Sequence, residues 1–288
     1  DISALEQPFR NTLLGTEQLE HHAREVAGGH AEVHAATNLR SLLAALERNA
    51  KVLQAAYATL TEDTRGQLDI SPAAEWLLDN FHIIADQIRE VRQDLPSGYY
   101  RELPRLSSGP FANQPRVYAL ALELIAHTDS RIDPAQLLSY VNAYQSVTPL
   151  YMGELWAVAI MLRAGLIENL ARLARMVIAA RQARAAANYW ADQLLQQNHG
   201  TNVLRSPALA ALMREHPRLS PTFAVQLVHQ LSNYDGEHDV GPLITWLEQQ
   251  PMMPFNTIEA LIHAEHQRQA AAQASVGNAI TSMRTLNA

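Results

Sequence analysis

The sequence contains no cysteine, and only one of its 22 basic residues, Lys51, is a lysine. The absence of cysteine excludes disulfide bonds, thiolate nucleophiles and cysteine-ligated zinc sites, and it fits a reducing compartment such as the cytoplasm. The dominance of arginine is typical of a GC-rich genome rather than of a particular chemistry. The formal net charge of −7 argues against a nucleic-acid-binding domain.

Long hydrophobic runs and phosphate-binding motifs are also lacking. The longest strongly apolar run, from Leu155 to Leu162, is ended by Arg163, far short of the roughly 20 residues that a membrane span needs. No signal peptide is visible, and neither GxGxxG nor GxxxxGK[ST] occurs. We therefore expect a soluble segment that neither crosses a membrane nor cradles a nucleotide phosphate.

The length of 288 residues and the hydrophobic fraction of 48% are enough for one large domain or two smaller ones. Because the sequence begins at Asp1 and a helical pattern continues to Ala288, we expect it to be a piece of a longer protein.

Helix starts are marked clearly, whereas strand signals are absent. Ser-Pro or Asp-Pro opens an apolar-periodic run at Ser71, Asp133, Ser206 and Ser220. No alternating β-branched run bounded by hairpin turns is present. The sequence thus predicts an all-α fold, a multi-helix bundle or stacked helical array without a substantial β-sheet. Helices are expected near residues 16–28, 38–61, 72–93, 116–128, 134–146, 151–185, 186–197, 206–215, 221–232, 240–250, 257–273 and 275–286.

Two breaks divide this pattern. Residues 95–115 hold four prolines and are too long for a plain helix connection, which predicts either a functional loop or a packed excursion. A second break lies near residues 198–206. We therefore predict an N-terminal helical bundle over residues 1–198, with an irregular loop at 95–115, and a smaller set of short helices over 199–288 that could belong to the same domain.

Five segments, spread over nearly the whole chain, resemble the N-terminal region of bacterial cyclic β-1,2-glucan synthases. The most informative is AEWLLDNFHIIADQIREVRQDLPSGYYRELPRL, which joins an amphipathic helix to a loop rich in tyrosine and arginine. The other four, in chain order, are FRNTLLGTEQLEHHAR, PRVYALALELIAHTDSRIDP, GELWAVAIMLRAGLIENLARLA and SVGNAITSMRTL.

The resemblance implies a membrane-bound parent that elongates glucan from UDP-glucose, cyclises it through a transglycosylase part and controls its length through a phosphorylase-like part. It also implies a divalent metal and DxD-like and QxxRW-like motifs in the glycosyltransferase part, but neither motif occurs here. We therefore expect a non-catalytic scaffold without a cofactor of its own. It would lie at the cytoplasmic face of the bacterial inner membrane, with the remaining domains of the parent synthase as its partners.

The same scaffold could contact the growing β-1,2-glucan. Aromatic rings stack on sugar faces, and arginine and carboxylate groups bind neighbouring hydroxyls, so loops and helix ends that combine them are candidate sites. The predicted glucan-binding residues are Tyr99, Tyr100, Arg101, Arg105, Tyr118, Asp129 and Arg131. For Asp129 and Arg131 the alternative is a local ion pair that stabilises the turn.

A second hypothesis is a glycoside-active helical enzyme, since glycosidases place two carboxylates on opposite sides of the scissile bond. Asp129 and Glu154 are the only pair that we would nominate, as weak catalytic candidates. The alternative for Glu154 is a structural ion pair with an arginine such as Arg116 or Arg163. A third hypothesis, a module that binds other envelope proteins, cannot be separated from the scaffold by sequence.

No metal site is expected. His30 and His34 are one helical turn apart, and His21 with Glu25 repeats the spacing, but Gly28 and Gly29 separate the two pairs and no HExxH pattern is present. The histidines at positions 82, 127 and 263 are interpreted as ordinary core or surface residues.

Overall fold

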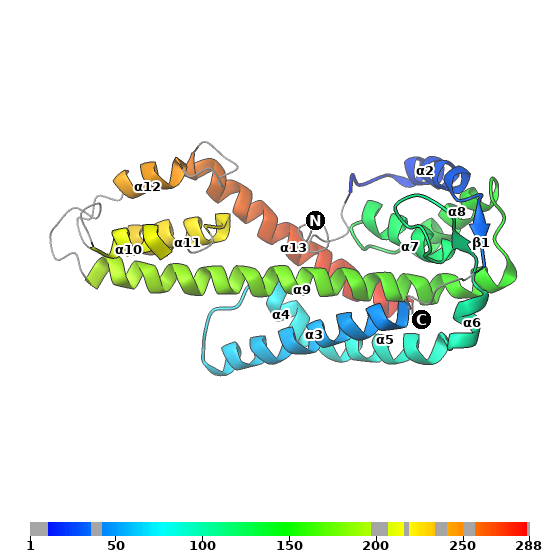
Figure 1. Cartoon of the computed structure of the whole chain (residues 1–288), viewed down its shortest axis with the longest axis horizontal. Coiled ribbons are helices and arrows are strands. Elements are labelled where there is room, and N and C mark those ends of the chain that lie inside the picture. Colours follow the sequence, from blue (N-terminus) through cyan, green and yellow to red (C-terminus); the bar gives the residue numbers. More distant parts are fainter. Residues whose placement is uncertain are drawn as a thin grey trace. The chain divides into compact units, whose positions relative to one another are not determined.

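A computed structural model describes residues 11–35, 42–196, 207–215, 219–233, 241–249 and 257–286. Over these ranges the chain contains twelve helices and one sheet of two short strands, which confirms the predicted all-α class (Figure 1). The chain forms two compact units, residues 1–175 with 272–288 and residues 176–271. The boundary predicted at 198/199 falls within residues 197–206, outside the described residues, and stays a prediction.

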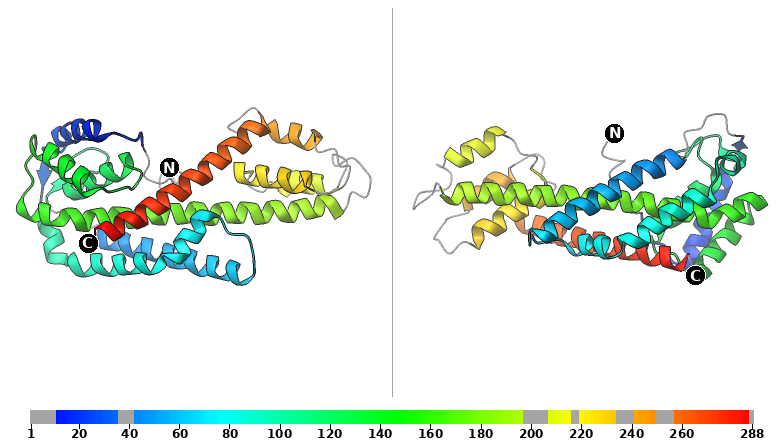
Figure 2. Two further views of the ribbon diagram at one scale, coloured as in Figure 1. Left: turned by 180° about the vertical axis from the view of Figure 1, so that it is seen from behind. Right: turned by 90° about the horizontal axis from the view of Figure 1, so that it is seen from below.

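Most elements belong to the first unit. They are α2 (Thr16–Gly29), β1 (Val33–His34), α3 (Leu42–Arg65), α4 (Pro72–Asp79), α5 (Phe81–Asp94), α6 (Ser97–Glu102), β2 (Arg105–Leu106), α7 (Arg116–His127), α8 (Pro134–Gln145), the first part of α9 (Met152–Gln196) and the last part of α13 (Ile258–Thr285). Within this unit α2 packs along α8, and α3 contacts both α4 and α5 (Figure 2).

Helix α7 lies in the core of the first unit, since ten of its twelve residues are buried. Its contact with α9 depends on Gly165. A Cβ atom at this position would lie 2.7 Å from Cδ1 of Ile125 and 3.1 Å from Cδ2 of Leu122, closer than such atoms normally approach. The glycine thus lets the two helices come close together at this point.

The Ser-Pro and Asp-Pro motifs do mark helix starts, although the serines and the aspartate do not all act in the same way. Asp133 accepts hydrogen bonds from the N–H groups of Ala135 and Gln136, both at 3.0 Å, and caps α8. Ser220 accepts one from Phe223 at 3.2 Å. Ser71 makes no side-chain cap, and its helix begins on the fixed φ of the following proline.

The helix predicted over 72–93 is two helices, α4 and α5, divided at Asn80. The Nδ2 of Asn80 donates to the carbonyl of Trp76 at 2.9 Å, and its Oδ1 accepts from Arg284 at 2.6 Å. A side-chain amide that bonds the backbone competes with the regular helical ladder, which accounts for the break. Conversely, the breaks predicted near 185/186 and 274/275 are wrong, because α9 and α13 continue through them.

Residues 95–115 form an ordered segment that packs against the rest of the first unit. This is the second of the two alternatives predicted from the sequence, the packed excursion. The segment contains α6 and β2, and β2 pairs antiparallel with β1 through Val33 opposite Leu106 and His34 opposite Arg105. Leu106 also exchanges backbone hydrogen bonds with the turn that follows, through Gln114 at 3.0 Å and Asn113 at 2.9 Å.

The second unit has a hydrophobic core of its own. It contains the later part of α9, α10 (Pro207–Glu215), α11 (Pro221–Ser232), α12 (Gly241–Glu248) and the first part of α13. Trp190, Leu212, Phe223 and Leu227 are among the buried residues of this core. In neither unit is any described helix both long and apolar enough to cross a bilayer.

Candidate functional site

The turn between α7 and α8 has the most unusual backbone in the first unit. Asp129 and Ser130 are consecutive non-glycine residues with positive φ, 49° and 65°. Both are nearly inaccessible, with relative exposures of 6% and 0%. Left-handed conformations are costly for such residues and persist only where the surrounding structure holds them.

The surrounding structure does hold this turn through its polar atoms. The hydroxyl of Ser275 donates to Oδ1 of Asp129, and Nδ2 of Asn278 donates to the Asp129 carbonyl at 3.1 Å. Both partners come from α13. The Asp129 carboxylate is therefore part of the attachment of α13 to this turn.

Ser130 is attached in the same way. Its carbonyl accepts from Ser282 of α13 at 2.7 Å, and its hydroxyl accepts from Asn169 of α9 at 2.8 Å. Ser282 in turn accepts from the backbone N–H of Ile132 at 2.8 Å. The turn between α7 and α8 is thus joined to both α9 and α13 through largely buried hydrogen bonds, which makes it a structural junction.

An open pocket of about 700 Å³ lies beside this turn, and its polar lining includes Asp129, Arg131, Asp133, Gln136 and Asn278. Arg131 is exposed, whereas the Asp133 carboxylate is engaged in capping α8. Of the predicted glucan-binding residues, only Asp129 and Arg131 line the pocket.

Tyr100 and Arg105 lie in the interior instead, each with a relative exposure of 1%. The Arg105 guanidinium carbon is 4.6 Å from the centre of the Tyr100 ring, and the side chain donates to the Asn113 carbonyl at 2.8 Å. The Tyr100 hydroxyl accepts from the N–H of Leu42 at 3.2 Å. These contacts hold α6 and β2 to the start of α3.

Tyr118 is also buried, and its hydroxyl donates to Oε2 of Glu168 at 2.6 Å. Arg172 donates to the other oxygen of Glu168 at 2.9 Å. Burial, together with the negative charge of Glu168, raises the pKa of Tyr118 well above its usual value. This phenol is therefore a neutral hydrogen-bond donor inside the unit.

Tyr99 and Arg101 are the remaining predicted glucan contacts. The hydroxyl of the partly buried Tyr99 donates to the carbonyl of Gly153, and burial raises the pKa of Tyr99. Arg101 is exposed. Arg101 and Arg131 are thus the two predicted residues whose side chains face solvent.

The two candidate catalytic carboxylates are each held by partners of their own. Glu154 is only 1% exposed. Its carboxylate accepts hydrogen bonds from Nε of Arg116 at 3.0 Å and from Nη2 of Arg116 at 2.5 Å. It also accepts from the N–H of Tyr151 at 2.9 Å. Burial alone would lower the pKa of Arg116, but the hydrogen bonds and charge of Glu154 outweigh it and raise that pKa. The ion-pair alternative for Glu154 is confirmed, and a glycosidase site is not favoured.

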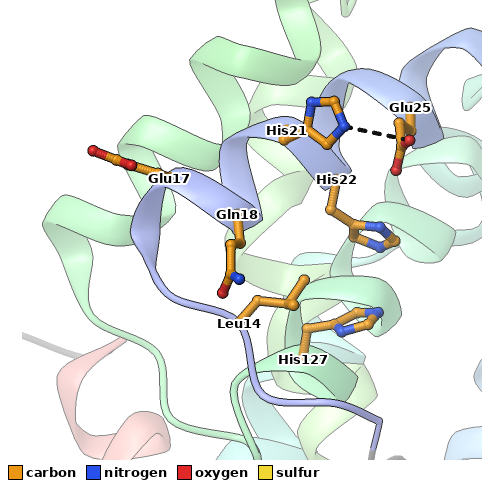
Figure 3. A pocket seen from close by; sticks show the side chains of 7 residues that line it. All are labelled: Leu14, Glu17, Gln18, His21, His22, Glu25 and His127. Carbon is orange, nitrogen blue, oxygen red and sulfur yellow. Dashed lines mark ion pairs between the residues drawn. The ribbon is translucent and has the colours of Figure 1, made fainter.

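A cluster that the sequence did not predict lies between α2 and α7. His22 of α2 approaches Glu123 and His127 of α7, with 3.1 Å between His22 Nε2 and Glu123 Oε2 and 3.7 Å between His127 Nε2 and the same oxygen. Figure 3 shows the His22 and His127 rings close together, and their centres are 4.3 Å apart. Only the spacing of four residues between Glu123 and His127 is visible in the sequence.

The fold and site together define an all-α region in which the two candidate catalytic carboxylates, Asp129 and Glu154, take part in structural contacts. No family model matches the chain. The chain is 37% identical over 244 residues, 83% of its length, to the cyclic beta-(1,2)-glucan synthase NdvB of Rhizobium meliloti (strain 1021). The chain spans only 8% of the length of that relative. The resemblance noted from the sequence is therefore confirmed: the chain is similar to a small part of a cyclic β-1,2-glucan synthase.

Proposed function

We propose that the chain is a helical scaffold of a cyclic β-1,2-glucan synthase and packs against the remaining domains of that protein. The observation that carries the proposal is the coverage of the match, 83% of this chain against 8% of the relative. A region this small in a much longer enzyme, with its buried carboxylates in structural contacts, is suited to support and positioning.

In this proposal the chemistry belongs to the rest of the synthase. Elongation from UDP-glucose with a divalent metal, cyclisation and length control would occur in other domains, since the chain has neither a DxD-like nor a QxxRW-like motif. The scaffold would lie at the cytoplasmic face of the bacterial inner membrane, where those domains act.

An exposed apolar surface at the start of α9 is the proposed docking face. Tyr151, Met152 and Trp156 have relative exposures of 65%, 64% and 73%. Met152 and Trp156 are four residues apart and share one side of the helix. Tryptophan and tyrosine contribute disproportionately to binding energy at protein interfaces. The proposed occupant is the remainder of the synthase, because the relative extends far beyond this region.

The test is co-purification of this chain with a separately expressed synthase that lacks the region. Trp156→Ser combined with Met152→Ser should abolish co-purification without changing the circular dichroism of the chain. Leu138→Ser is the matched control, since Leu138 is 63% exposed on α8, away from the three docking residues in sequence. Unchanged association of the double variant would contradict this docking face.

We also propose that glucan contacts the pocket beside the α7–α8 turn. Support comes from its volume of about 700 Å³ and from the exposed guanidinium of Arg131. Calorimetry with linear β-1,2-glucan should show binding that Arg131→Ala weakens and that Arg24→Ala, an exposed arginine on α2, does not. If both variants and the unmodified chain gave equal heats of binding, the result would contradict glucan binding in this pocket.

A further inference from the structure

His22, Glu123 and His127 bring three potential metal ligands to one point between α2 and α7. Their ligand atoms all lie within 4.8 Å of one another. We propose that these residues bind a divalent transition-metal ion, best matched by Zn²⁺, through two imidazoles and one carboxylate. Two histidines and a glutamate are a ligand set that zinc uses when it leaves a coordination position open.

The hydrogen bond of the other ring nitrogen of His127 supports this assignment. Nδ1 of His127 lies 2.8 Å from the carbonyl oxygen of Thr12. A carbonyl can only accept, so Nδ1 carries the proton and donates it, and in the neutral ring Nε2 is the unprotonated nitrogen. A backbone carbonyl that fixes the tautomer in this way is the usual outer partner of a metal-ligating histidine.

As a consequence, the lone pair on Nε2 of His127 faces the carboxylate of Glu123. In neutral His127, Nε2 presents its lone pair toward Oε2 of Glu123 at 3.7 Å. Two acceptors at this distance repel each other unless positive charge lies between them. A second proton on the imidazole would supply that charge, and so would a metal ion held by both groups.

The spacing is close to what a zinc ion requires. Tetrahedral ligands at 2.0–2.1 Å from the metal are about 3.4 Å apart. The separations of His22 Nε2 and His127 Nε2 from the Glu123 oxygen, 3.1 Å and 3.7 Å, bracket this value. The His22 side chain is 22% exposed, so a small rotation of this ring can complete the geometry, with loss of any proton on Nε2.

The site is open on one side. A pocket of about 490 Å³ is lined by both histidines and by Glu17, His21 and Glu25 of α2 (Figure 3). Water or another small oxygen ligand would enter the fourth position from this pocket. The ion would also link α2 directly to α7. Binding of the ion should therefore stabilise the first unit against unfolding.

The experiment uses the 288-residue chain after treatment with a chelator. Calorimetry with ZnCl2 should show one saturable site per chain, and Co²⁺ should give the visible absorption of a four- or five-coordinate ion. Addition of Zn²⁺ at 100 times its dissociation constant should raise the Tm by about 5 °C or more, because the ion binds only the folded state.

Glu123→Gln and His22→Asn should each weaken Zn²⁺ binding by at least about 100-fold, since loss of an outer partner alone can cost that much. His21→Asn is the matched control: it lines the same pocket from the same helix but lies outside the cluster. Its affinity should be unchanged. If the Glu123→Gln variant fails to fold, the His22→Asn variant alone provides the test. His22 is the more exposed of the two histidines, so its substitution is the less disruptive to folding. Absence of saturable binding, equal binding by the cluster variants, or loss that follows His21→Asn instead would each overturn the proposal.

Discussion

Arg116 of α7 and Glu154 of α9 form a two-point ion pair in which the side chains are only 4% and 1% exposed. Each residue stands at the first turn of its helix, so the pair fixes the starts of two core helices against each other. Because the pair is buried, neither charge can be stabilised by water once its partner is removed.

Glu154→Gln should therefore lower the free energy of unfolding by about 3–5 kcal/mol, since it leaves the Arg116 charge buried and uncompensated. Urea unfolding followed by circular dichroism measures the change. The control is Asp86→Asn, which removes the partner of Arg89 in an exposed pair of 72% and 50% exposure and should cost less than about 1 kcal/mol. Equal effects of the two substitutions would contradict the structural role of the buried pair.

Gly165→Ala should destabilise the first unit by about 1–3 kcal/mol, because the added methyl group collides with Ile125 and Leu122 of α7. Gly277→Ala makes the same chemical change in α13, where nothing lies within 4 Å of the new atom. The control variant should gain about 0.5–1 kcal/mol from the better helix propensity of alanine. In thermal unfolding, Gly165→Ala should lower the stability of the chain and Gly277→Ala should raise it. Higher stability for both variants would contradict the close approach of α7 and α9 at Gly165.

The end of α3 offers a stabilising substitution. Gln67 has φ 56°, and the backbone bonds from Gln67 to Thr64 at 3.1 Å and from Leu68 to Asp63 at 3.0 Å form a Schellman motif. Because a left-handed residue other than glycine costs about 1–2 kcal/mol, Gln67→Gly should raise the free energy of unfolding by up to about 1 kcal/mol. A lower denaturation midpoint for this variant would argue against the motif.

Acid should destabilise the first unit in part through His30. Burial lowers the pKa of His30; the nearby Glu123 charge opposes this effect and Arg116 adds to it. The unfolded chain then binds a proton as the pH falls through about 6.5, before the folded chain does. Stability from this residue is complete above that pH and is lost progressively below it.

His30→Gln should accordingly reduce the fall in Tm between pH 7.5 and pH 5.5, measured with a chelator present. His34→Gln is the control, because the His34 side chain is only partly buried and donates to the carbonyl of its neighbour Ala35. If the pH dependence of the Tm were unchanged in His30→Gln, protonation of His30 would not contribute to acid destabilisation.

The helix pattern was readable from the sequence because its signals are local. Pro72, Pro134, Pro207 and Pro221 each begin a helix, as predicted. The errors came from residues whose polar groups have distant partners. Asn80, which accepts from Arg284, 204 residues away, divides the helix predicted over 72–93, whereas Ser275, which donates to Asp129, 146 residues away, lies inside the continuous α13.

The site could be predicted only in part, for the same reason. Composition drew attention to Tyr100 and Arg105, yet whether such residues face solvent depends on packing that the sequence does not reveal. The cluster of His22 with Glu123 joins positions 101 residues apart, and no local spacing relates them. The exposed Arg131, by contrast, lies in a turn that the sequence located correctly.

The junction at Asp129 and Ser130 also orders events during translation. Its hydroxyl partners, Ser275 and Ser282, leave the ribosome after the whole of the second unit has been synthesised. Until then the strained turn has no α13 to hold it. The contacts of the first unit can therefore be completed only late in synthesis, when the returning part of α13 becomes available.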